Sequence, residues 1–212
     1  MTDTGETLTL YGIARSRAMR NLWLLKEIGI PFRHAGIVQT YNKTSAEQTT
    51  SRDADFLAIN RNGRIPALKD GDLVLCESMA INLYLAKKYG GALGPTDLAE
   101  DGLATMWSFW ALNECEGNAI AVHEAGLENP STAASAAIDK LAGPFSVLET
   151  ALQTRDYLVG DRFTVADINV AVVLYYARNA TGLFARYPAV ERWYHATVGR
   201  PHFQDVLRMR EA

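Results

Sequence analysis

Residues 59–90, INRNGRIPALKDGDLVLCESMAINLYLAKKYG, decide the fold of the first part of this chain. Within them, Ile65-Pro66 opens a short predicted strand, and the Asp70-Gly71 pair is a strong signal for a hairpin turn. Residues 73–75 form the return strand, and Ser78 is a natural N-cap for the helix that follows. The apolar face of that helix comprises Ile81, Tyr84 and Leu85. The stretch therefore predicts a β-hairpin that leads directly into a helix.

The same stretch predicts a surface that binds a small peptide. Because Pro66 donates no hydrogen bond to a sheet, the backbone N–H and C=O of Ile65 can face outward. The start of the following helix offers free N–H groups to a carboxylate, and Glu77 offers a carboxylate to an ammonium group. Together these groups suit a peptide-like ligand with a zwitterionic end.

Three motifs give the chain a resemblance to the glutathione transferase family, and they occur in the family's order and spacing. They are LTLYGIARSRAMRNLWLLKEIGIP at residues 8–31, NRNGRIPAL with the following D-G and E-S-M-A-I at 60–81, and FTVADINVA at 163–171. The sequence departs from the family at Arg61, where many members have proline at a structural position. On these motifs the chain is similar to cytosolic, serine-type, bacterial-like members.

The first ninety residues alternate predicted strands and helices. We expect strands at 8–11 and 32–38, a helix at 17–28, a weak helix at 46–58, and then the hairpin and its helix. This order predicts a four-stranded mixed sheet with helices on both faces. The resemblance implies that this N-terminal domain has the thioredoxin-like fold.

A second, all-helical domain is predicted after the glycine-rich linker GGALGP at residues 90–95. Helices are expected at 96–126, 131–154, 164–179 and 188–197, with a short terminal helix after them. The fold class is therefore α/β plus all-α, with a thioredoxin-like domain at 1–89 and a helical domain at 96–212. Within the latter, Thr164 and Asp167 form a capping-box variant whose expected role is stability.

Composition and residue spacing indicate which partners the protein can bind and in which compartment it acts. The 212 residues are 48% hydrophobic and carry a net charge of −3, which argues against nucleic acid as a partner. The longest apolar run, at 170–177, is too short to cross a membrane, and residues 1–6 lack the basic start of a secretory signal. The two cysteines suit a reducing cytoplasm, and the four scattered histidines predict no metal site.

Two hydroxyl groups are candidates for stabilising the glutathione thiolate. Ser16 lies between the first strand and the first helix, and its spacing to Arg20 matches serine-type members of the family. Its alternative role is an ordinary helix cap. Tyr11, at the end of the first strand, is the rival because other members use a tyrosine there, although a strand-end tyrosine is commonly a packing residue. Ser16 is the preferred assignment.

The resemblance also implies the residues that bind glutathione, the co-substrate. Glu77 accepts the α-ammonium group, and the Ser78 hydroxyl and N–H hold the α-carboxylate. Ile65 pairs its backbone with the cysteinyl unit, and Pro66 after it is expected to be cis. Arg64 is a candidate for the glycyl carboxylate because a guanidinium matches carboxylate geometry, and its alternative is a solvated surface side chain.

A second pocket for the electrophile has weaker candidates. Trp107 and Trp110 are three residues apart and can line an apolar cleft, together with Arg15 and Asn113. Aromatic residues at helical spacing are more often part of a core, so this alternative stays open.

The function that the resemblance implies is conjugation of glutathione to small apolar electrophiles, as a detoxification or catabolic step in the cytoplasm. Isomerase, dehalogenase and peroxidase reactions would use the same site. Because position 16 is serine and not cysteine, the deglutathionylating reductases are disfavoured. The alternative from another class is a non-catalytic binding or assembly module, since a fold never guarantees an activity. The resemblance further implies a homodimer.

Overall fold

The computed structural model describes residues 8–125 and 132–211. The chain separates into two compact units. The first unit runs to Gly91 and also contains the C-terminal segment from Pro201, whereas the second comprises Ala92–Arg200. The sequence pattern predicts a helical domain at 96–212, which would include the segment from Pro201; in the structure this segment belongs to the first unit.

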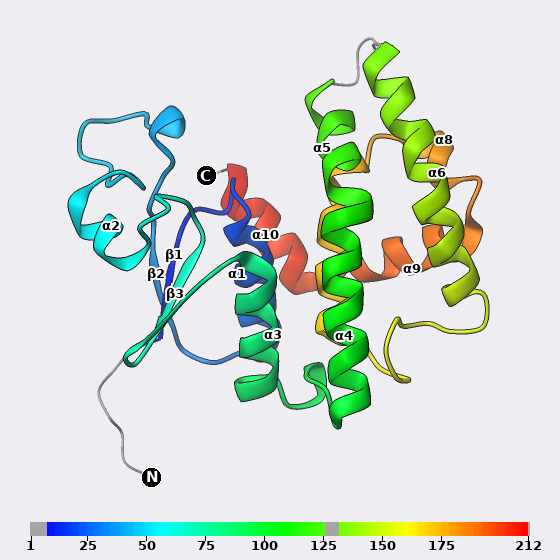
Figure 1. The fold of residues 1–212 in the computed structure, drawn as a ribbon, viewed down its shortest axis with the longest axis horizontal. Helices are drawn as coiled ribbons and strands as arrows, with labels where there is room; N and C mark the ends of the chain where they lie inside the picture. Colours follow the sequence, from blue (N-terminus) through cyan, green and yellow to red (C-terminus); the bar gives the residue numbers. More distant parts are fainter. Residues whose placement is uncertain (1–7, 126–131, 212) are drawn as a thin grey trace. The chain divides into compact units, whose positions relative to one another are not determined.

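The first unit is built on a four-stranded mixed sheet, as the sequence predicts (Figure 1). Its strands are β1 (Thr9–Tyr11), β2 (Arg33–Ala35), β3 (Ala67–Asp70) and β4 (Leu73–Cys76), in the spatial order β2-β1-β3-β4. β1 runs parallel to β2 and antiparallel to β3, and β3 and β4 form the predicted hairpin. The turn of that hairpin contains Gly71 at φ 60°, a conformation that favours glycine.

Helices cover both faces of this sheet. They are α1 (Ala18–Ile28), α2 (Ala54–Ile59), α3 (Ser78–Tyr89) and α10 (Pro201–Glu211). Figure 1 shows α2 on one side of the strands and the other three helices on the opposite side. The C-terminal helix α10 belongs to this unit because it packs on α1, where the rings of Trp23 and Phe203 lie 4.4 Å apart and both side chains are fully buried.

The segment between β2 and β3 departs from the predicted pattern. The expected strand at 32–38 ends at Ala35, and the expected helix at 46–58 is limited to α2. Local side-chain bonds explain the loss of helix: Thr50 N–H donates to the Asp53 carboxylate at 2.9 Å, and Thr44 N–H donates to Gln48 at 2.8 Å. Such bonds offer the backbone an alternative to helical pairing. A short 3₁₀ turn at Thr40–Asn42 lies in this segment.

The second unit is helical, and α7 lies at its centre with all ten residues buried. After a 3₁₀ turn at Gly91–Leu93, its elements are α4 (Leu98–Trp110), a π-helical segment (Ala111–Glu116), α5 (Gly117–Glu124), α6 (Thr132–Leu152), α7 (Val165–Leu174), a 3₁₀ turn (Tyr175–Ala177), α8 (Thr181–Phe184) and α9 (Pro188–Val198). Among the residues that the structure describes, no helix is long and apolar enough to cross a membrane.

The predicted capping box at the start of α7 is present. Thr164 N–H donates to Asp167 Oδ2 at 2.9 Å, and Ala166 N–H donates to Thr164 Oγ1 at 3.3 Å. Asp167 does more than the sequence indicates, because its Oδ1 also accepts from Leu158 N–H at 3.0 Å and from Trp193 Nε1–H at 2.9 Å. One fully buried carboxylate therefore joins the loop before α7, the helix itself and α9.

Hydrogen bonds from Arg162 connect the start of the second unit to α4. The Arg162 guanidinium donates to both carboxylate oxygens of Glu100, at 2.9 and 2.6 Å, and to the carbonyl oxygens of Ala92 and Gly94. Thr96 N–H also donates to Glu100, at 2.8 Å. These bonds favour the ionised carboxylate and lower the pKa of Glu100 to about 2.

Acid should weaken the Glu100–Arg162 pair. A carboxylate whose pKa is lowered by folding stabilises the fold above its ordinary pKa of about 4.3, and this contribution is lost as the pH falls toward about 2. Because the pair is partly exposed, we expect Glu100→Gln to cost about 1 kcal/mol of unfolding free energy at pH 7. In urea unfolding the difference from wild type should shrink steadily below about pH 4. A difference that stays constant down to pH 3 would contradict this assignment.

Candidate functional site

The turn between β1 and α1 places Ser16 at the start of the helix. The Ser16 hydroxyl donates to the Ile13 carbonyl at 2.8 Å and accepts from the N–H of Ala18, the first residue of α1, at 3.1 Å. Gly12, at φ 136°, allows the chain to enter this turn, and a Cβ atom there would lie 2.8 Å from the Ala18 Cβ and 3.3 Å from the Ile65 Cβ. The turn therefore lies directly against Ile65.

A cis peptide bond between Ile65 and Pro66 lies directly before β3, the first strand of the hairpin, as the resemblance implies. The loop before it is fixed by Asn60, whose Nδ2 donates to the Arg64 carbonyl at 2.7 Å and whose Oδ1 accepts from Asn62 N–H at 3.1 Å. Ile65 is buried and the Arg64 side chain is exposed. Local polar bonds thus position the backbone of both predicted residues.

The prediction that Ser78 is the N-cap of α3 is wrong. The cap position is Glu77, without a side-chain cap bond, and Ser78 is the first helical residue. The Ser78 side chain cannot cap the helix because it turns inward, where its Oγ accepts from Arg20 Nη1 at 3.1 Å. Glu77 is exposed and has φ 68°, a left-handed conformation that is uncommon for a residue other than glycine.

A buried polar network holds α1 against the start of α3. Asn21 Nδ2 donates to the Ser78 carbonyl at 2.8 Å and to Asn82 Oδ1 at 2.7 Å, and Asn82 Nδ2 donates to the Arg20 carbonyl at 3.3 Å. Each of these four side chains is at least 95% buried. The network fixes the position of Ser78, and the sequence signal for it was the pair Arg20-Asn21 among the apolar residues at 18–25.

A cleft of about 690 Å³ opens in the first unit beside Ile65. Its lining comprises Arg17, Gln39, Thr40, Tyr41, Ser51, Arg52, Gly63, Arg64 and Ile65. This lining includes three arginines and no carboxylate, so the cleft favours an anionic ligand. Sequence reasoning found Arg64 and Ile65, and it missed Arg17, Arg52 and the residues at 39–41. The loop at 39–42 carries no motif, whereas the position of Arg17 next to Ser16 was an available signal.

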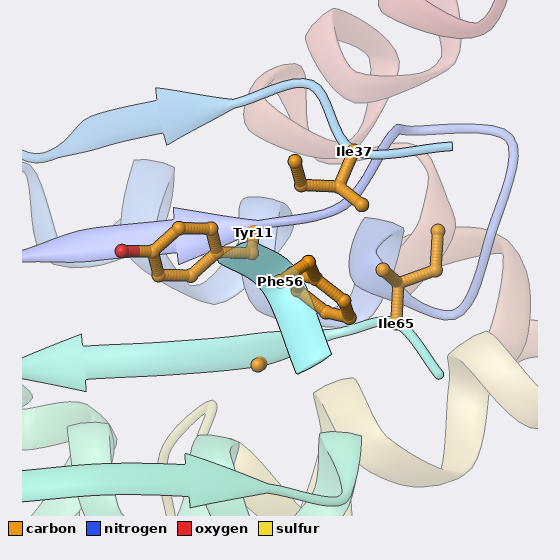
Figure 2. Packing of buried hydrophobic residues seen from close by; sticks show 5 residues of the cluster. Tyr11, Ile37, Phe56 and Ile65 are labelled. Atoms are coloured by element: carbon orange, nitrogen blue, oxygen red, sulfur yellow. The ribbon is translucent and has the colours of Figure 1, made fainter. Parts of the chain in front are cut away.

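Tyr11 lies in a hydrophobic cluster of the first unit. Its ring is 6.1 Å from that of Phe56, and Ile37, Ile65 and Ala67 complete the buried cluster. Figure 2 shows the Tyr11 hydroxyl pointing away from Ile65. The geometry of Tyr11 is therefore that of a packing residue, whereas Ser16 belongs to the turn that abuts Ile65.

The four candidates for an electrophile pocket are divided between the two units. In the second unit, the rings of Trp107 and Trp110 lie 5.1 Å apart and nearly perpendicular; Trp107 is buried, Trp110 half-buried, and Asn113 is exposed on the π-helical segment. In the first unit, Arg15 is exposed and its Nε donates to the Arg210 carbonyl of α10. The burial of Trp107 fits the alternative that it is a core residue.

Within residues 8–125 and 132–211, no group of three His, Cys, Asp or Glu side chains is placed to hold a metal ion. Cys76 is half-buried beside Glu77, and Cys115 is fully buried. Burial raises the pKa of Cys115 to about 12 and that of Cys76 above its ordinary value, so both thiols are protonated at neutral pH.

Comparison with known proteins assigns a family to both parts of the sequence. Residues 6–87 match the family model described as "Glutathione S-transferase, N-terminal domain", and residues 128–196 match "Glutathione S-transferase, C-terminal domain". Together the two matched segments account for well over half of the chain.

Individual relatives match along nearly the whole chain. Glutathione S-transferase 3 of Zea mays is 37% identical over 94% of this chain and 93% of its own length. Glutathione S-transferase GstB of Escherichia coli K12 is 31% identical over 94% and 97%. Among solved structures, the theta class glutathione S-transferase of Xanthomonas axonopodis pv. citri with glutathione bound has a TM-score of 0.74 and 26% identity, and covers 94% and 96% of the two chains.

Proposed function

Because this chain belongs to the glutathione S-transferase family, we propose that it transfers the thiolate of glutathione to small apolar electrophiles. The observation that carries the proposal is the arginine-lined cleft beside Ile65, which adjoins the Ser16 turn. Glutathione with an ionised thiol carries three negative groups and one ammonium group. A cleft with three guanidiniums, and an exposed carboxylate at Glu77, complements that charge pattern.

Each part of glutathione has a proposed partner. Glu77 accepts the α-ammonium, and Ser78, held at the start of α3 by Arg20 and Asn21, binds the α-carboxylate. The backbone of Ile65 pairs with the cysteinyl unit as a neighbouring strand would. Arg64 binds the glycyl carboxylate. This orientation places the cysteinyl sulfur at the β1–α1 turn.

The proposed chemistry depends on ionising the thiol near neutral pH. A free thiol titrates near pH ~8.5, and a hydrogen bond from the Ser16 hydroxyl at the positive end of α1 stabilises its thiolate. The thiolate then attacks the electrophilic carbon and forms a carbon–sulfur bond, while a leaving group departs or a double bond is saturated. Isomerisation, dehalogenation and peroxide reduction begin from the same thiolate. A panel of halogenated and unsaturated electrophiles tests the proposal, and absence of turnover with every one would refute it.

Glu77 should control the affinity for glutathione. Glu77→Gln removes the negative charge with little change in size, so the bound ammonium loses a charge-assisted hydrogen bond worth about 1.5–3 kcal/mol. We expect the Kd measured by calorimetry to rise about tenfold or more, with the pKa of the bound thiol unchanged. Asp72→Asn, an exposed carboxylate in the adjacent hairpin turn, is the matched control. An unchanged Kd in Glu77→Gln would remove Glu77 from the site.

We also propose a homodimer, which the family resemblance implies. Leu103, Met106 and Phe109 form an exposed apolar row on α4, with 41%, 48% and 58% of their surface accessible. Leu73 and Val74 on the edge strand β4 are similarly exposed. Exposed apolar patches of this kind commonly mark protein–protein interfaces.

Sedimentation tests the dimer directly. Wild type should sediment at about twice the 23.3 kDa subunit mass, and Phe109→Glu should shift the protein toward the monomer because it introduces a charge into the apolar row. Val147→Glu, an exposed apolar residue on α6, is the control and should leave the mass unchanged. A monomeric wild type would refute the dimer.

The proposed setting is the cytoplasm, where glutathione is abundant and reducing conditions keep thiols free. The unpaired state of Cys76 and Cys115 is consistent with such a compartment. In that setting the reaction would remove toxic electrophiles or serve a catabolic step.

A further inference from the structure

The hydrogen bonds of Ser16 constrain what it can offer to the sulfur. A serine hydroxyl has one proton, and Ser16 gives it to the Ile13 carbonyl at 2.8 Å while accepting from Ala18 N–H. To donate to a thiolate, the hydroxyl must turn away from Ile13. Because this exchanges one hydrogen bond for another, the net stabilisation from Ser16 is smaller than that of a hydroxyl whose proton is unused.

A cation lies next to Ser16 in the chain and in the cleft. Arg17 occupies the N-cap position of α1, is exposed, and lines the same cleft as Ile65. Gly12, where the turn that carries these residues begins, lies close both to Ile65, where the cysteinyl unit is proposed to bind, and to Ala18, the residue after Arg17. A sulfur bound there would therefore lie near the start of α1 and near the residue that follows Ser16.

We infer that the Arg17 guanidinium is a second thiolate-stabilising group, an inference that rests on the proposed function. Arginine is charged at all relevant pH values, so its attraction for a thiolate does not depend on an unused hydrogen-bond donor. An opposite charge within about 4–6 Å of an ionisable group shifts its pKa by about 1–3 units toward the charged form. Arg17 thus lowers the pKa of the bound thiol, whereas Arg52 and Arg64, on the loops before and after α2, are left to bind the glycyl carboxylate.

The test is a pH titration of the thiolate absorbance of glutathione bound at saturation, in wild type and three variants. Arg17→Gln should raise the pKa of the bound thiol by about one unit or more. The calorimetric Kd for glutathione, measured at a pH below the bound-thiol pKa of both proteins, should change less than about threefold. At a pH below the bound-thiol pKa of both wild type and Arg17→Gln, the conjugation rate of the variant should be about tenfold lower for each unit by which its thiol pKa is raised. Arg17→Lys should keep most of the effect. Arg33→Gln removes an exposed charge on β2 outside the cleft lining and should change nothing.

Four outcomes would overturn the inference. An unchanged thiol pKa in Arg17→Gln, with the wild-type pKa lowered, refutes it and leaves the proposed function intact. A large rise in Kd without a pKa change makes Arg17 a carboxylate-binding residue instead. Equal pKa shifts in Arg17→Gln and Arg33→Gln show a general charge effect. Failure of wild type to bind glutathione refutes the proposed function itself, and the inference with it.

Discussion

Asp167→Ala is expected to lower the free energy of unfolding of the helical unit by about 3 kcal/mol or more. The Asp167 carboxylate is fully buried and accepts from Thr164 N–H, Leu158 N–H and Trp193 Nε1–H. Removing it leaves these donors without their acceptor in a site shielded from water. Each buried donor that loses its partner costs about 1–3 kcal/mol.

Urea unfolding followed by circular dichroism measures this loss. Asp167→Asn should recover only part of it, because an amide has one acceptor oxygen where the carboxylate has two, and its NH₂ group would face N–H donors. Asp161→Ala, which removes an exposed carboxylate six residues earlier, is the control and should cost less than about 0.5 kcal/mol. A loss below 1 kcal/mol in Asp167→Ala would show that the buried contacts contribute little.

Ser16→Ala is expected to reduce turnover at neutral pH by roughly ten- to a hundredfold, with the affinity for glutathione nearly unchanged when it is measured below the pKa of the bound thiol. A hydrogen bond to a charged group contributes about 1.5–3 kcal/mol, which corresponds to that range of rates. Because the Ser16 hydroxyl gives up its bond to Ile13 in order to donate to the thiolate, we expect a loss near the tenfold end of the range. The pKa of the bound thiol should rise with the loss of rate. Since the Ser16 hydroxyl also accepts from Ala18 N–H at the start of α1, the variant should lose about 1 kcal/mol of stability, so rates are compared well below its melting temperature.

Two variants separate the hydroxyl's chemistry from its structural role. Ser16→Thr keeps a hydroxyl that can both accept and donate, and it should retain most of the activity. Tyr11→Phe removes the rival hydroxyl and should change the rate little, because Tyr11 packs against Phe56 and its hydroxyl points away from Ile65 (Figure 2). A larger loss in Tyr11→Phe than in Ser16→Ala would show that Tyr11 is the thiolate stabiliser.

Features with short-range signals could be predicted from the sequence. The hairpin follows from Asp70-Gly71, and the capping box follows from Thr164 and Asp167, because in both cases the interacting groups lie within a few residues. The parallel pairing of β1 with β2 follows from the helix between them. In these places local propensity and the final structure agree.

Features that depend on distant packing could not be predicted. Serine is a residue type that is common at N-caps, yet the Ser78 side chain points inward because it accepts a hydrogen bond from Arg20 on another helix. The C-terminal helix α10 joins the first unit because Phe203 packs on Trp23, 180 residues earlier. The cleft could not be predicted either, because its lining residues come from segments that are far apart in the sequence. These are the β1–α1 turn and the loops on either side of α2.

The most direct test of the central claim is a titration of wild type with glutathione, monitored by calorimetry and by thiolate absorbance as a function of pH. We expect saturable binding at or below millimolar glutathione, with the pKa of the bound thiol below the ~8.5 of a free thiol. Absence of binding at millimolar glutathione, or a bound thiol that titrates like the free one, would contradict it.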